Sequence, residues 1–136
     1  DRVHECAVAE AEIGPLRLAD AAAAATVSDP TARRRALHVV NENQRVRTFA
    51  AALAVGDLDT AGALMVQSHN SLRDLYDTST PVMDRAVRAL LDIPGVYGAR
   101  MTGGGFGGCV VALCEHGALT DGWVVQPVGA AAITTD

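Results

Sequence analysis

Apolar residues recur at helical spacing over the middle of the chain. Between residues 31 and 55 they occupy Ala36, Val39, Val40, Val46, Phe49, Ala50 and Leu53, with charged residues between them. This 3.6-residue period predicts one long amphipathic helix. Asp29 and Pro30 precede it as cap and first-turn residues, and Gly56 follows as its stop.

Similar patterns predict helices on both sides of the long one. They cover residues 2–12, 16–26, 58–76 and the segment from Thr80-Pro81 to Pro94-Gly95. The first of them stops at Gly14-Pro15. The short joint at Gly56-Asp57 makes the two central helices antiparallel neighbours, with Asp57 as the cap of the second.

After Gly95 the pattern changes to short β-branched runs. VYGARMT (96–102) and CVVALC (109–114) predict two strands, WVVQPV (123–128) a third and AAITT (131–135) a weak fourth. The expected class is therefore α+β, with helices packed on a small antiparallel sheet.

A glycine-rich loop joins the first two predicted strands. It consists of Gly103, Gly104, Gly105, Phe106, Gly107 and Gly108. The letters satisfy G-x-G-x-x-G, but a strand follows where a dinucleotide site needs a helix. A loop of this kind can offer backbone N–H groups to a phosphate or let another backbone approach closely. The alternative is a wide hairpin that binds nothing.

Composition narrows the function classes. With 136 residues, a net charge of -5 and scattered arginines, the chain is one domain without a basic footprint for nucleic acid. No apolar run reaches the roughly 20 residues of a membrane span, and no signal pattern opens the chain, so we expect a cytoplasmic protein with no membrane partner. Cys6, Cys109 and Cys114 lack metal-site spacing and are interpreted as reduced core residues.

Several stretches resemble one known family. GVYGARMTGGGFGGCVVAL (95–113) resembles the third conserved motif of the GHMP kinases and, in its wording, that of the galactokinases. Residues 1–20, 33–46 and 64–84 are similar to consecutive segments of a galactokinase C-terminal region. The resemblance reaches from Asp1 to about Cys114.

This resemblance implies a GHMP kinase C-terminal, ferredoxin-like domain over residues 1–136, with the N-terminal ATP- and sugar-binding domain absent. The complete enzyme would use ATP and Mg²⁺ to phosphorylate galactose or a related sugar, and this chain alone would bind neither and be inactive. Thr102 and the glycine loop would line the nucleotide and substrate cleft. Ser68 and His69 either have a structural role or stand on the substrate side of this cleft. No catalytic or metal-binding residue is expected here.

The implied partners are the N-terminal kinase domain, in the same chain or a separate one, and a second copy in a homodimer. A stand-alone, non-catalytic binding module derived from the same fold is the alternative. It is motivated by the tail, because the 8 residues EHGALTDG between Cys114 and Trp123 are fewer than the roughly 10–12 that a crossover with a helix needs. The C-terminal part is therefore expected to be shortened.

Other polar residues receive less specific interpretations. Leu75 and Thr80 depart from residues common in galactokinases, an acidic residue and a cysteine. Asp74 and Asp77 are interpreted as solvated charges near a helix end. Arg100 either helps to hold the loop or phosphate, or is a strand-end side chain without a ligand. The remaining histidines, His4, His38 and His116, are expected at the surface.

Overall fold

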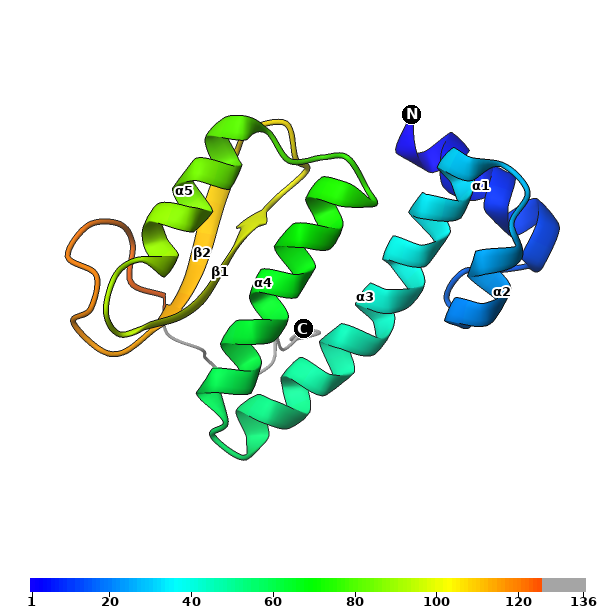
Figure 1. The fold of residues 1–136 in the computed structure, drawn as a ribbon. Coiled ribbons are helices and arrows are strands. Elements are labelled where there is room, and N and C mark those ends of the chain that lie inside the picture. The colour runs from blue at the N-terminus through cyan, green and yellow to red at the C-terminus, as the bar shows by residue number, and fades with distance from the viewer. Residues whose placement is uncertain (126–136) are drawn as a thin grey trace, which may run out of the picture.

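A computed structural model describes residues 1–125 as five helices and one two-stranded sheet (Figure 1). The elements are α1 (Arg2–Ile13), α2 (Ala21–Thr26), α3 (Pro30–Ala54), α4 (Leu58–Asp74), α5 (Pro81–Leu91), β1 (Val96–Thr102) and β2 (Cys109–Cys114). The expected α+β class, with helices beside a small antiparallel sheet, is confirmed.

Local capping signals set most helix ends. Asp29 accepts the Ala32 amide at 2.7 Å, and Asp57 accepts the Thr60 amide at 3.0 Å, as the sequence predicts. The alanine-rich helix is shorter than predicted. It starts at Ala21 rather than Leu16, because Asp20 caps it.

The elements follow one another across the molecule, from α5 and the sheet through α4 and α3 to α1 and α2 (Figure 1). The largest buried cluster lies among α1, α2 and α3. It is built from small side chains, namely Ala9, Leu16, Ala24, Val27, Ala32, Ala36 and Val40. Small residues let these helices approach closely, so the first three helices form one packed unit.

The predicted apolar stripe of α3 is only half buried. Ala36 and Val40 lie in the core, but Val46 is 61% and Leu53 is 42% exposed. The apolar side of the predicted amphipathic helix therefore lies in the core only over its N-terminal half. In residues 1–125, α1 and α2 cover only the first half of α3, and α4 leaves one side of the second half open.

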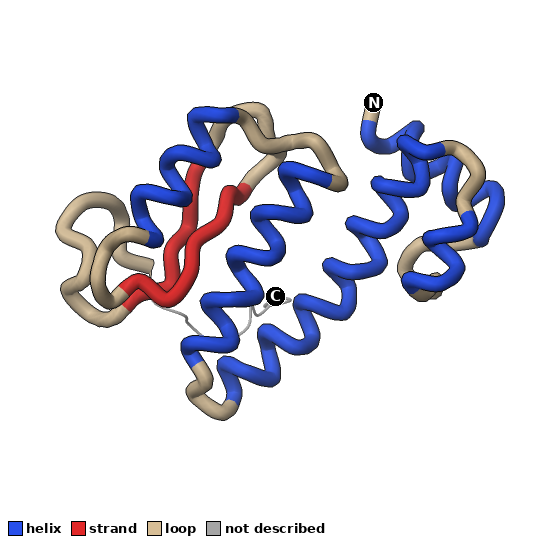
Figure 2. The backbone as a smooth tube through the Cα atoms, viewed as in Figure 1, coloured by secondary structure: helices blue, strands red, loops and turns tan. Residues whose placement is uncertain are grey.

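Strands β1 and β2 lie side by side and are joined by the glycine loop (Figure 2). They pair antiparallel, with Thr102 opposite Cys109 and Met101 opposite Val110. The predicted hairpin is confirmed. The third predicted strand is not borne out over Trp123 to Val125, which are exposed and outside regular structure. Its remainder and AAITT lie outside the described residues. No helix in residues 1–125 is long and apolar enough to span a bilayer.

Candidate functional site

The glycine loop spans residues 103–108 at one end of the hairpin and is largely exposed. Five of its six residues have positive φ: Gly103, Gly105, Phe106, Gly107 and Gly108. Phe106 adopts φ 57°, an uncommon value for a bulky residue, and its side chain is 69% exposed. The loop therefore holds a specific, non-extended path.

The loop is fastened to the connection between α4 and α5. The Phe106 amide donates to the Thr78 carbonyl at 2.8 Å. A Cβ added at Gly105 would lie 2.8 Å from both the Cβ and the carbonyl oxygen of Thr78. Glycine is therefore required at position 105 by a close approach within the chain itself as well as by its φ of +86°.

The other amides of the glycine loop are available to bind a ligand. Among the described residues, none of the amides of Gly103, Gly104, Gly105, Gly107 and Gly108 donates a hydrogen bond. A Cβ added at Gly104 meets nothing within 4 Å, so one side of the loop is open. Unpaired backbone amides on such a loop can bind an anion or another hydrogen-bond acceptor.

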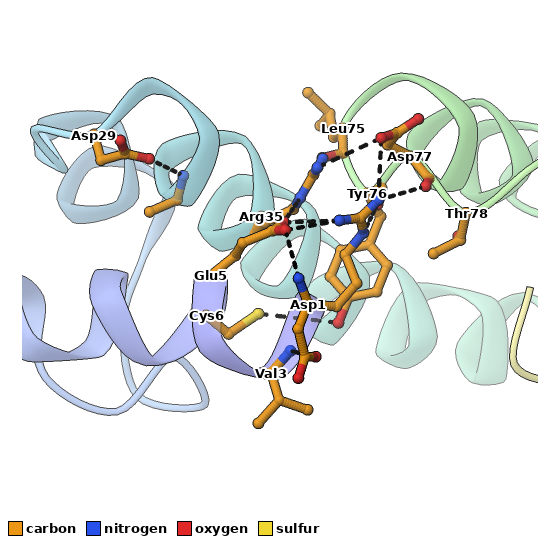
Figure 3. Close-up of polar contacts among 12 residues, drawn as sticks. Asp1, Val3, Glu5, Cys6, Asp29, Arg35, Leu75, Tyr76, Asp77 and Thr78 are labelled. Atoms are coloured by element: carbon orange, nitrogen blue, oxygen red, sulfur yellow. Dashed lines mark hydrogen bonds and ion pairs between the residues drawn. The ribbon is translucent and has the colours of Figure 1, made fainter.

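Arginines hold the other side of the α4–α5 connection (Figure 3). Arg35, which is buried in α3, donates to the Leu75 carbonyl at 2.5 Å and pairs with Glu5. Arg2 donates to the carbonyls of Tyr76 and Asp77. The Arg35 hydrogen bond is the largest factor that lowers the pKa of Glu5 to about 2. The connection is thus clamped between α1 and α3 on one side and the glycine loop on the other.

His38 is part of the same support, contrary to the prediction of a surface histidine. It is buried, its ring stacks on Tyr76 at 4.3 Å between centroids, and its Nδ1 lies 2.8 Å from the Ser71 hydroxyl. Burial, aided by nearby arginines, lowers the pKa of His38 to about 4. His4 and His116 are exposed, as expected.

Ser68 and His69, the substrate-side candidates, are both 2% exposed. The Ser68 hydroxyl donates to Glu42 at 2.5 Å. His69 Nε2 lies 3.1 Å from Asp84 Oδ1, and its Nδ1 accepts the Met101 amide at 3.3 Å. Burial lowers the pKa of His69, although Asp84 opposes this effect. Both side chains are thus engaged inside the protein.

A groove of about 370 Å³ runs between α3, α4 and the sheet. It brings together Thr102 and Ser68 from the predicted set, while the six loop residues and His69 are not among its lining residues. Its charged lining comes from Glu42, Arg45 and Arg100. Arg100 is half-buried and donates to the Met101 carbonyl at 3.0 Å.

Thr78, Glu42 and Arg45 were missed by the sequence interpretation. Glu42 and Arg45 form an ion pair one helical turn apart in α3, and this spacing beside an apolar stripe is the signal that could have found them. Thr78 has no such signal, because its partner lies 28 residues away at Phe106.

The acidic residues and cysteines within residues 1–125 form no metal site. Among residues 1–125, no three His, Cys, Asp or Glu side chains gather to hold a metal ion. Asp74 and Asp77 are exposed, as predicted, and pair with arginines. All three cysteines are free, but Cys109 is exposed, so its interpretation as a core residue is wrong. It faces outward at the start of β2.

Comparison with known proteins gives a consistent result. Residues 49–120 match the family model described as "GHMP kinases C terminal". The galactokinase of Bos taurus is 60% identical over 85 residues, which are 62% of this chain and 22% of that protein. The galactokinase of Mycobacterium tuberculosis H37Rv is 47% identical over 117 residues, or 83% of this chain and 30% of that protein.

A solved structure agrees with these sequence relatives. Lactococcus lactis galactokinase, crystallised with galactose, superposes with a TM-score of 0.79 and 34% identity. The match covers 85% of this chain and 32% of that one. The chain therefore spans less than a third of the length of each of these relatives.

Proposed function

Because the chain belongs to the GHMP kinases, whose C-terminal domain it contains, we propose that it acts as the C-terminal part of a galactokinase-like enzyme. The whole of residues 1–136 would serve as this domain, and its partner would be an N-terminal kinase domain in the same chain or a separate one. The reaction would be transfer of the terminal phosphoryl group of ATP to the anomeric hydroxyl of galactose or a related sugar, in the cytoplasm.

The observation that carries this proposal is the glycine loop, which is fastened at Thr78 and keeps five glycine amides free of partners among the described residues. Phosphoryl transfer depends mainly on positioning and on stabilising developing negative charge. Backbone N–H groups held in fixed positions supply both positioning and charge stabilisation without a side chain. Thr102 stands at the same end of β1 and would line the cleft with the loop.

Mg²⁺ is the metal that such a reaction implies. It is usually held by one or two carboxylates together with substrate phosphates and water, and no group of three candidate ligands gathers in residues 1–125. We therefore assign no Mg²⁺ ligand to them. The proposal accordingly expects no turnover by the isolated chain in an ADP-release assay with Mg-ATP and galactose.

A hybrid enzyme tests the proposal directly. Residues of this chain would replace the matching 117 residues of Mycobacterium tuberculosis galactokinase, with which they share 47% identity. We expect the hybrid to phosphorylate galactose. A folded, soluble hybrid without activity would contradict the proposal.

Gly104→Ala sharpens the test. Since its added Cβ meets nothing within 4 Å in this chain, the variant should fold normally but place a methyl group on the ligand side of the loop. We expect a raised KM for ATP or galactose at an unchanged Tm. Ser28→Ala, at an exposed joint between α2 and α3, serves as the control and should leave both unchanged.

The stand-alone binding module remains a second candidate because of the exposed apolar residues on α3. Within residues 1–125, Val46, Leu53 and the adjoining Val55 are 61%, 42% and 80% exposed. Apolar surface of this kind often binds another protein. Sedimentation of the purified chain tests for such association. A dimer favours the module or a homodimer, and a monomer at high concentration counts against both.

A further inference from the structure

His69 joins three elements at the base of the glycine loop. It projects from α4, reaches Asp84 in α5 through Nε2, and accepts the Met101 amide of β1 through Nδ1. The His69 side chain is 3% exposed, so water does not compete for these contacts. A buried polar group with both its polar atoms satisfied rigidifies the elements that it connects.

The two contacts define one tautomer. A backbone N–H can only donate, so Nδ1 must carry the lone pair that accepts it. Nε2 then carries the proton and donates to the Asp84 carboxylate. The same Asp84 oxygen accepts the Ser79 hydroxyl at 2.6 Å, which orients the carboxylate. His69 is therefore held as a neutral ring between a donor and an acceptor.

This polar cluster lies next to both fastening points of the loop. Met101 precedes Thr102, after which the loop begins, so His69 fixes the backbone where the chain enters the loop. Ser79 follows Thr78, whose carbonyl accepts the Phe106 amide. The entrance of the loop and its midpoint are thus tied to the same group of side chains.

We propose that His69 is a positioning residue, which sets the path of the glycine loop through the Met101 amide and, with Asp84 and Ser79, through Thr78. It acts from the interior and does not touch a ligand. This role agrees with the structural alternative for His69 and differs from a place on the substrate side. Its consequence for catalysis rests on the proposed function, but its effect on the loop does not.

The wild-type chain offers the first test. Long-range ¹H–¹⁵N spectra of the imidazole at pH 7 report which ring nitrogen carries the proton. We expect His69 as the neutral Nε2–H tautomer. A neutral Nδ1–H tautomer, or an imidazolium, would overturn the proposal, because Nδ1 could then no longer accept the Met101 amide.

Two substitutions separate the two contacts. In His69→Asn the amide oxygen can stand near the position of Nδ1 and accept from Met101, whereas in His69→Gln the amide nitrogen can replace Nε2 but no acceptor remains at Nδ1. Amide hydrogen exchange in the 136-residue chain is the readout. We expect His69→Gln to speed exchange of the Met101 and Phe106 amides about tenfold over His69→Asn, in keeping with one lost hydrogen bond.

His38→Asn is the matched control, since His38 is also buried but contacts Tyr76 and Ser71. It should lower global stability without changing the relative protection of the Met101 amide, which His38 does not contact. Ser79→Ala, at a half-buried site, is a milder variant if the His69 variants fail to fold, and should speed exchange at Phe106 more than at Met101. The proposal would be overturned if His69→Asn and His69→Gln had equal effects on exchange of these amides, or if Ser79→Ala had none.

The exchange measurements need no substrate, so their failure leaves the kinase proposal untouched. In the hybrid enzyme, kinetic measurements on the same two His69 variants give an independent test. We expect His69→Gln to lower kcat/KM more than His69→Asn does. An inactive hybrid would contradict the proposed function while leaving the loop-positioning role supported by exchange.

Discussion

Gly62 in α4 and Gly98 in β1 lie backbone against backbone. A Cβ added at Gly98 would stand 2.2 Å from the Gly62 carbonyl oxygen, and one added at Gly62 would stand 2.1 Å from the Tyr97 carbonyl oxygen. Because these distances exclude any side chain, the helix approaches the strand more closely than ordinary packing permits. This contact brings the following turns of α4, including His69, against the end of β1.

Gly98→Ala and Gly62→Ala should each lower the free energy of unfolding by about 3 kcal/mol or more, because the added methyl group must push two backbones apart. Denaturant unfolding measures the loss. Gly104→Ala is the control, since its site is open, and should stay within about 0.5 kcal/mol of the wild type. Similar values for all three variants would show that the close contact is not maintained in solution.

Gly105→Ala should disturb the loop itself. Its Cβ meets Thr78 at 2.8 Å, and its φ of +86° is unfavourable for alanine. We expect a loss of about 1–3 kcal/mol, with amide chemical-shift changes concentrated in the loop and at Thr78. If Gly104→Ala produced the same shifts at Thr78, the fastening would not be specific to Gly105.

Arg35→Met should destabilise the clamp on the α4–α5 connection. The change removes Arg35 from Glu5 and from the Leu75 carbonyl, although Glu5 keeps its pair with Arg2. We expect a loss of about 1.5–3 kcal/mol, as for a hydrogen bond to a charged group. Thermal and urea unfolding report the loss. Arg34→Met is the control: the neighbouring side chain is exposed and its replacement should change little. Equal stability of the two variants would contradict the clamp.

Stability should fall as the pH drops below about 6.5. The folded-state pKa of His38 is about 4, below the ordinary value, so between these values the unfolded chain binds more protons and protonation favours unfolding. His38 alone should cost about 2 kcal/mol between pH 7.5 and pH 5.0. The lowered pKa of His69 adds to the loss in the same direction.

His38→Gln provides the check on this pH dependence. Urea unfolding of both proteins at pH 7.5 and 5.0 should show a smaller pH effect in the variant, by about 2 kcal/mol. Glu5 does not interfere, since its pKa of about 2 places its own contribution, lost on acidification, below about pH 4.5. An unchanged pH effect would mean that His38 titrates normally in the folded state.

The order of elements and most of their ends could be predicted from the sequence. Hydrogen bonds and φ preferences that act over a few residues set the helix starts and the hairpin around the glycine loop. The helix starts in question lie at Asp29-Pro30, Asp57 and Thr80-Pro81. The candidate site was found in the same way, because its glycines are consecutive. The family resemblance follows from these same local stretches.

What the tertiary structure decided is which of these residues meet. Arg2 reaches the Tyr76 carbonyl across 74 positions and His69 reaches Met101 across 32, and no local pattern encodes such pairs. Tertiary contacts between distant segments also decide the burial of His38, the exposure of Val46 and the contact of Gly62 with Gly98. Local sequence sets backbone conformation through short-range sterics and hydrogen bonds, whereas burial and pKa depend on groups that only folding brings together.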